Sequence, residues 1–195
     1  MTVKHISIAV DPEQTGNPVF GAPADLTAYI LEPVEGITDK KRPAVLLCPG
    51  GGYHKLSGRE DQPIAMKYLA AGFHVFVLHY SLAPDVFPRA LMELALSMKL
   101  IREHGDEWNV DVKRIAVSGF SAGGHLACCL GTFWNKELLY KALDVTPDII
   151  QPNGMILCYP VITSGEYCHK GSFECLMGTE VSKKDLELRR LLSLE

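Results

Sequence analysis

Short apolar runs alternate along the chain with longer segments in which apolar residues recur every three or four positions. The short runs are typical of buried strands, and the longer segments have the spacing of amphipathic helices. The expected strands cover residues 26–31, 44–48, 74–79, 114–117 and 155–159. The expected helices cover residues 59–71, 88–104, 124–133 and 182–192. Strands and helices that take turns predict an α/β fold with a mostly parallel sheet and helices on both faces, and residues 26–31 are expected to form an antiparallel strand.

The C-terminal third of the chain has weaker patterns. Ser182 with Asp185 three positions later resembles a capping box and predicts the start of the last helix. Residues 161–180 contain glycine and cysteine without clear periodicity, and we expect a cap or substrate-side loop there. No linker or internal repeat interrupts the pattern, so residues 1–195 are expected to form a single domain.

Composition and charge narrow the classes of function. The chain has 195 residues, of which 47% are hydrophobic, which is enough for one continuous core. Its formal net charge of −4 argues against a nucleic-acid partner. The start of the chain lacks the features of a signal peptide, and no apolar run reaches the roughly 18 residues that span a bilayer. A soluble cytoplasmic protein without a membrane partner is expected, and a homo-oligomer stays open.

The cysteines are expected to be unpaired. Two fall in predicted strands and two are adjacent on a predicted helix, where they point in different directions, so we expect small buried side chains in a reducing compartment. These four are Cys48, Cys158, Cys128 and Cys129. Cys168, His169 and Cys175 lie close together, but they lack the spacing of a metal site, and no metal is expected.

Gly119-Phe120-Ser121-Ala122-Gly123 is the segment that points most directly to chemistry. It follows the apolar run 114–118 and precedes a helical pattern, which is the strand, tight turn and helix that a G-x-S-x-G nucleophile elbow requires. Small neighbours let the backbone bend sharply, so a serine hydroxyl can project from the turn. Ser121 is therefore the predicted catalytic nucleophile, with a structural serine in a glycine-rich turn as the alternative.

A triple glycine follows the predicted strand 44–48. Pro49-Gly50-Gly51-Gly52-Tyr53 can bring backbone N–H groups close to a negatively charged oxygen with no side chain in the way. Alone, such a run is often only a flexible turn. Together with the later elbow, it predicts an oxyanion hole formed by the N–H groups of Gly51, Gly52 and Ala122.

These segments resemble the α/β-hydrolase superfamily, in its esterase/lipase branch. The branch carries an H-G-G-G loop and a Y-R-L-A-P segment, to which Pro49–Gly52 and Tyr80-Ser81-Leu82-Ala83-Pro84 correspond here. Pro49 replaces the usual histidine and Ser81 the usual arginine. Pro-Gly-Gly-Gly-Tyr is similar to acetyl-xylan-esterase-like and feruloyl-esterase-like carbohydrate esterases. The resemblance spans roughly residues 26–192 and implies an α/β-hydrolase three-layer sandwich whose last strands lie beyond residue 195.

The resemblance implies a serine esterase that acts on small acyl esters, most simply acetyl esters of carbohydrates, without metal or organic cofactor. A peptidase or amidase on the same scaffold and an inactive hydrolase-like binding module are the alternatives. A serine needs a histidine base and an acid, which in this fold follow the nucleophile. Both are expected beyond residue 195, in the rest of a longer enzyme, with a naturally short chain as the alternative; residues 1–195 alone should hydrolyse esters poorly.

Several residues within the chain are weaker candidates for the site. His125 is expected to be structural because a helix carries its ring away from Ser121. His169, preceded by Asp144 and Asp148, has the right order for a base but the wrong spacing. Tyr53, His54 and His169 are substrate-side candidates. His79 is expected to be a buried, partnered histidine, and the acids Glu60, Asp61 and Asp85 are expected to be solvated or to cap helices.

Overall fold

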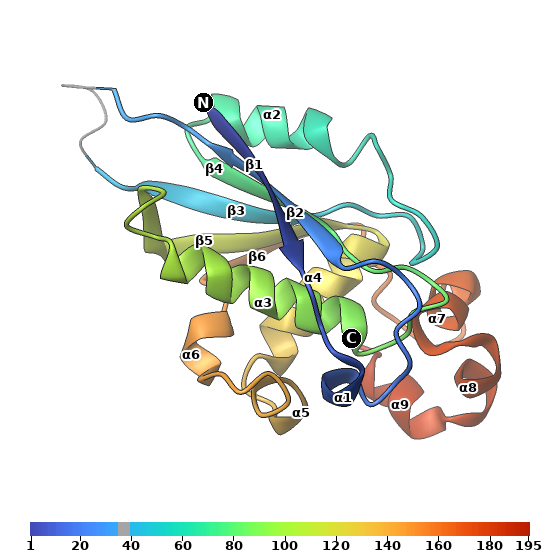
Figure 1. Ribbon diagram of the computed structural model, residues 1–195. Coiled ribbons are helices and arrows are strands. Elements are labelled where there is room, and N and C mark those ends of the chain that lie inside the picture. The colour runs from blue at the N-terminus through green and yellow to red at the C-terminus, as the bar shows by residue number, and fades with distance from the viewer. Residues whose placement is uncertain (35–39) are drawn as a thin grey trace.

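The computed structural model describes residues 1–34 and 40–195, and a six-stranded sheet lies at its centre (Figure 1). The strands are β1 (Thr2–Ile8), β2 (Ala24–Ile30), β3 (Arg42–Cys48), β4 (His74–His79), β5 (Val110–Phe120) and β6 (Gly154–Cys158). Their order across the sheet is β1-β2-β4-β3-β5-β6. β4, β3, β5 and β6 run parallel to one another, whereas at one edge β2 runs antiparallel to β4 and β1 runs antiparallel to β2. The expected α/β class and the antiparallel early strand are confirmed.

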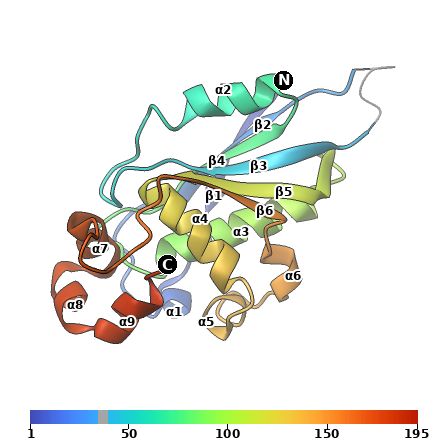
Figure 2. The same ribbon diagram turned by 180° about the vertical axis from the view of Figure 1, so that it is seen from behind.

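The helices are unequally divided between the two faces of the sheet (Figure 2). One face is covered by α2 (Gln62–Ala70), and the other by α3 (Arg89–Glu103) and α4 (Ala122–Phe133). The remaining helices are short: α1 (Pro12–Thr15), α5 (Glu137–Tyr140), α6 (Pro147–Ile150), α7 (Lys170–Met177), α8 (Thr179–Lys184) and α9 (Leu186–Leu191). α7, α8 and α9 lie together beyond the carboxyl ends of the parallel strands in both views. No helix in residues 1–34 or 40–195 has the length and apolar character needed to cross a membrane.

The core explains why the central strands are apolar at nearly every position. Alternate residues of β3 and β4 point to opposite faces, and both faces are covered. Leu46 and Phe76 belong to the large cluster under α3 and α4, whereas Leu47 and Val75 belong to a smaller cluster under α2. A strand buried on both faces has no polar alternation, which is the pattern seen in the sequence.

The structure departs from the predicted elements mainly near the two ends of the chain. β1 was not expected, and it pairs with β2 along its whole length. Residues 161–180 contain the helix α7 instead of an uninterrupted loop. The predicted capping box at Ser182 is wrong, because Ser182 is buried within α8 and the Asp185 side chain accepts the N–H of Leu188 to start α9. The single last helix is therefore two helices.

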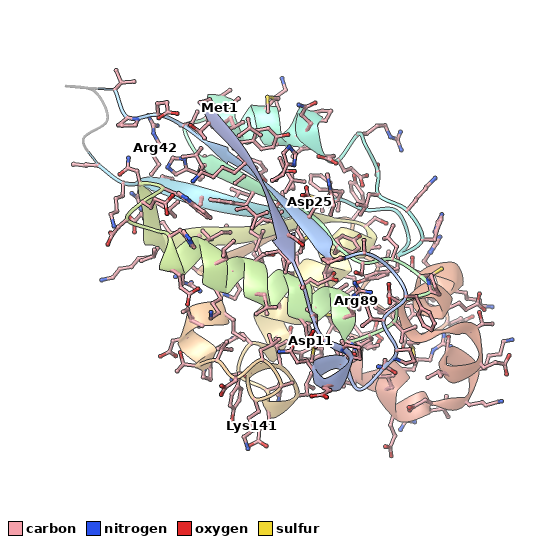
Figure 3. All side chains as sticks on the ribbon, in the orientation of Figure 1. Met1, Asp11, Asp25, Arg42, Arg89 and Lys141 are labelled. Carbon is pink, nitrogen blue, oxygen red and sulfur yellow. The ribbon has the colours of Figure 1, made fainter. Side chains whose placement is uncertain are left out.

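A buried ionic network holds the start of α3. Arg89 Nη1 lies 2.7 Å from Asp85 Oδ2, and Arg89 Nε lies 3.0 Å from Glu93 Oε1. Figure 3 labels Arg89, whose Nη2 also donates to the carbonyl oxygen of Ala22 in the segment before β2. Glu93 Oε2 accepts the N–H of Ser81 at 2.7 Å. Asp85 is thus part of an internal network, and the expectation of a solvated or simple capping group is wrong.

Candidate active site

Ser121 occupies the single-residue bend between β5 and α4. Its φ of 52° and ψ of −116° lie in a region that L-residues with a side chain rarely adopt. The bend leaves the side chain half-buried on the wall of a cavity of about 450 Å³. The predicted strand, tight turn and helix are therefore present, and Ser121 faces an open cavity.

Two glycines make this bend sterically feasible. A Cβ on Gly119 would lie 2.1 Å from the carbonyl oxygen of Gly123. A Cβ on Gly123 would lie 2.1 Å from the carbonyl oxygen of Cys48 at the end of β3. Since real Cβ atoms do not come this close to backbone oxygens, α4 can start this near to β3 only with glycine at these positions.

The bend is also fastened to the edge strand β6. Ser121 donates its N–H to the carbonyl oxygen of Cys158 at 3.0 Å, and its own carbonyl oxygen accepts the N–H of Val161 at 3.1 Å. These bonds fix the backbone on both sides of the strained residue. The position of Ser121 therefore depends on the end of β6 as well as on β5 and α4.

The triple-glycine loop after β3 is closed by its own backbone. The carbonyl oxygen of Gly50 accepts the N–H of Ser57 at 2.8 Å, and the carbonyl oxygen of Gly51 accepts the N–H groups of His54 and Lys55. Gly51 has a φ of 133° and Gly52 a φ of 67°, which favour glycine. Within the part of the chain that the structure describes, no group accepts a hydrogen bond from the N–H of Gly51 or Gly52.

The glycine loop and Ser121 lie against each other. A Cβ on Gly50 would be 3.1 Å from the Cβ of Ser121, and Gly51 and Ser121 line the same cavity. The N–H of Ala122, in the first turn of α4, also has no acceptor among the described residues. The glycine loop and the first turn of α4, which are far apart in sequence, thus both border the serine and both carry unused N–H groups, as a site that stabilises an oxyanion requires.

The other walls of the cavity come from the segment between the glycine loop and α2 and from the residue after β6. They are formed by Lys55, Leu56, Ser57, Gly58, Arg59, Glu60 and Tyr159. Tyr159 has a φ of 37° and a 64% exposed side chain. Glu60 was expected to be solvated or to cap a helix, but it accepts hydrogen bonds from Gly50 N–H and from the Tyr159 hydroxyl.

Tyr53 points away from the cavity, which corrects its prediction as a substrate-side residue. Its side chain is 3% exposed, and its hydroxyl lies 2.8 Å from His125 Nδ1. His125 Nε2 lies 2.8 Å from the carbonyl oxygen of Leu192. A carbonyl oxygen can only accept, so Nε2 carries the proton and Nδ1 accepts from the tyrosine. His125 is therefore a structural histidine, and burial lowers its pKa.

The remaining candidate histidines do not meet Ser121. His169 starts α7, and its Nδ1 bonds to Ser172 Oγ at 2.8 Å. His54 is exposed, lies beside Gly52 and does not line the cavity. His79 Nε2 lies 2.7 Å from Asp61 Oδ2, and this hydrogen bond raises the pKa of His79. The expected partner of His79 is confirmed, but the His79 side chain is 35% exposed and not buried; Asp61 is paired and not simply solvated.

Among the residues that the structure describes, no histidine is placed as a base beside Ser121. The described residues include all seven histidines of the chain, and none of them hydrogen-bonds to the Ser121 hydroxyl. Asp144 and Asp148 lie near α5 and α6, at the other side of the molecule from the α7 helix that His169 starts (Figures 1 and 2). A relay from these acids through His169 to Ser121 is not formed.

The cysteine and histidine group near α7 is occupied by internal contacts. Cys168 Sγ accepts from Arg189 Nη2 at 3.3 Å, and His169 caps the helix. Across residues 1–34 and 40–195, no group of three or more metal-binding side chains is placed to hold an ion.

Comparison with known proteins gives a consistent set of relatives. The BD-FAE family model matches residues 33–153. The chain is 31% identical over 173 residues to endo-1,4-beta-xylanase B of Butyrivibrio fibrisolvens, a match that covers 86% of this chain and 26% of that protein. It is 30% identical over 139 residues to an acetylxylan esterase of Xylanibacter ruminicola, covering 70% of this chain and 26% of the relative.

Solved structures agree with these relatives. An acetyl ester-xyloside bifunctional hydrolase from Caldicellulosiruptor lactoaceticus superposes with a TM-score of 0.73 and 30% identity, over 90% of this chain and 63% of that one. A carboxylesterase from Lactobacillus plantarum gives a TM-score of 0.74 and 29% identity, over 100% of this chain and 66% of its own. The chain thus spans about a quarter of the curated relatives and about two thirds of the solved hydrolases.

Proposed function

Because the chain belongs to the BD-FAE family, we propose that it carries the nucleophile and the oxyanion hole of a serine carboxylic-ester hydrolase. The proposed substrates are small acyl esters, most simply acetyl esters of carbohydrates. The acetylxylan esterase and the acetyl ester-xyloside hydrolase among the relatives support this substrate class. The same relatives favour ester over amide hydrolysis.

One observation carries the proposal: Ser121 projects from a strained bend into a cavity that it shares with an unused N–H of the glycine loop. In the proposed reaction, Ser121 Oγ attacks the ester carbonyl carbon while its proton passes to a base. The carbonyl oxygen becomes an oxyanion held by the N–H groups of Gly51, Gly52 and Ala122. The alcohol then leaves with a proton, and water hydrolyses the acyl-serine.

We propose that the base and its acid come from outside residues 1–195. The placement of the seven histidines supports this, since none of them bonds to the Ser121 hydroxyl. A serine without a base keeps only the rate enhancement that the oxyanion hole and substrate binding provide. We therefore expect residues 1–195 alone to turn over activated acetyl esters slowly.

A cytoplasmic location is also proposed. All six cysteines lie in described parts of the chain and are free thiols. Free thiols are the ordinary state of cysteine in a reducing compartment.

The experiment that tests the proposal is the Ser121→Ala substitution in the full-length protein. We expect the hydrolysis of acetylated xylose and of 4-nitrophenyl acetate to fall by roughly 10³-fold or more, because the nucleophile is lost. A fluorophosphonate probe should label the unsubstituted protein at Ser121.

Ser118→Ala is the matched control. It removes a hydroxyl three residues earlier on β5, which is fully buried and lies 3.3 Å from the Tyr68 hydroxyl. Its activity should match that of the unsubstituted protein. Unchanged hydrolysis after Ser121→Ala would refute Ser121 as the nucleophile.

A further inference from the structure

Glu60 uses both of its carboxylate oxygens at the cavity. Oε2 accepts the N–H of Gly50 at 2.9 Å, and Oε1 accepts the hydroxyl of Tyr159 at 2.8 Å. One acceptor therefore bonds the loop after β3, and the other bonds the residue that follows β6. A single side chain therefore bridges the backbone of the glycine loop and the side chain of the residue that follows β6.

The contacts around Gly50 are close on every side. A Cβ on Gly50 would lie 2.5 Å from Glu60 Oε2 and 3.1 Å from the Cβ of Ser121. Ser57 donates its N–H to the carbonyl oxygen of Gly50, and Glu60 donates its own N–H to the carbonyl oxygen of Ser57 at 3.0 Å. The carboxylate, the glycine loop and the serine thus form one packed group.

The same side chain connects to the support of the elbow. Tyr159 directly follows Cys158, whose carbonyl oxygen accepts the N–H of Ser121. Hydrogen bonds therefore run from Gly50 through Glu60 to Tyr159, the residue next to the one that holds the elbow. Glycine backbones have wide conformational freedom, so unused N–H groups stay in one orientation only if other bonds fix the loop.

We propose that Glu60 is a positioning residue that fixes the oxyanion loop against the elbow, an inference that rests on the proposed function. Its negative charge cannot itself stabilise an oxyanion, so its contribution is geometric. Donors aimed at the developing charge accelerate acyl transfer only when they are preorganised. A displacement of about 1 Å in such a site can reduce the rate by about 10²-fold.

Two substitutions in the full-length protein separate geometry from charge. Glu60→Ala leaves the Gly50 N–H without its acceptor, and kcat should fall roughly 10- to 100-fold while KM changes less than about 3-fold. Glu60→Gln keeps an oxygen that can accept from Gly50 and an amide that can donate to Tyr159 Oη. It should keep kcat within about 5-fold of the unsubstituted protein, with the same pH profile.

Asp61→Ala is the matched control. It removes the neighbouring carboxylate, which pairs with His79 and does not line the cavity. It should lower the unfolding temperature and leave kcat unchanged. Two results would overturn the inference: a Glu60→Ala kcat within about 2-fold of the unsubstituted value, or a Glu60→Gln kcat as low as that of Glu60→Ala.

Amide hydrogen exchange tests the same inference without relying on catalysis. The Gly50 N–H should exchange slowly in the unsubstituted protein and in Glu60→Gln, and at least 10-fold faster in Glu60→Ala. Equal exchange in all three proteins would overturn the positioning role even if the protein hydrolyses esters. If the Gly50 N–H exchanges as expected but the protein hydrolyses no ester, the positioning role is supported and only the proposed function is refuted.

Discussion

Gly123→Ala is the substitution whose effect follows most directly from the packing at the elbow. The new methyl group would lie 2.1 Å from the carbonyl oxygen of Cys48 and 2.4 Å from that of Pro49. Both are backbone atoms at the end of β3, so neither can rotate away. The start of α4 must therefore move back from the sheet by about 1 Å to restore an ordinary carbon-to-oxygen distance.

The size of the effect can be set by comparing two opposing contributions. Overpacking costs about 1–3 kcal/mol, and replacing a helical glycine by alanine regains up to about 1 kcal/mol. The free energy of unfolding should therefore fall by no more than about 3 kcal/mol. Because Ser121 and the Ala122 N–H move with the helix, kcat/KM should fall about 10²-fold. The loss of activity should exceed what instability alone explains.

The assay combines ester hydrolysis with chemical denaturation of the full-length protein. Gly131→Ala is the control in the same helix, because the three atoms nearest to its Cβ would all belong to the side chain of Met155, which is 47% exposed and can move. That variant should keep its activity. If Gly123→Ala hydrolyses acetyl esters at a rate within about 3-fold of the unsubstituted protein, the argument that glycine is needed for this approach is wrong.

Two further predictions concern buried ionisable groups. His125→Phe leaves two buried polar partners unpaired and should lower the free energy of unfolding by about 2–5 kcal/mol. Burial lowers the pKa of His125 in the folded protein, so as the pH falls the unfolded chain binds a proton at this histidine before the folded protein does. The contribution of neutral His125 to the free energy of unfolding is therefore complete above about pH 6.5 and decreases as the pH falls. Between about pH 5.5 and 7.5, the free energy of unfolding measured by denaturation should depend less steeply on pH in His125→Phe than in the unsubstituted protein. An equally steep dependence in the variant would contradict a lowered pKa of His125. Arg89→Met leaves the Asp85 and Glu93 carboxylates buried without their cation and should lower the free energy of unfolding by about 3–5 kcal/mol. Lys99→Met, which removes an exposed ion pair, is the control and should lower it by less than about 1 kcal/mol in the same chemical denaturation assay.

The sequence predicts correctly those elements whose residue pattern lies within one short segment. The elbow at Gly119–Gly123 is recognisable because an apolar run, small residues and a helical pattern follow one another without a gap. The central strands are recognisable because both of their faces are buried. β1 was missed because it is an edge strand with a largely exposed pattern, and only its pairing with β2 makes it a strand.

The features that sequence reasoning missed depend on distant contacts. Glu60 and Tyr159 are 99 residues apart, so no spacing along the chain reveals their hydrogen bond. Tyr53 follows the glycine loop directly and therefore looked like a cavity residue, but its ring turns inward to His125. Near the C-terminal end, Asp185 could act as the second member of a capping box or as a cap of its own helix. Only the fold decides between these roles, because both use the same side-chain oxygens.

The contact of His125 with Leu192 also has a consequence for biosynthesis. A ribosome makes the glycine loop, the elbow and the histidine long before it adds the residue whose carbonyl oxygen accepts the histidine proton. Until Leu192 leaves the exit tunnel, the His125 ring lacks one of its two hydrogen-bond partners. Tyr53, next to the triple glycine, is then bonded to a ring that is not yet fully fixed. The nascent chain therefore carries Ser121 and the glycine loop before the scaffold around them is finished.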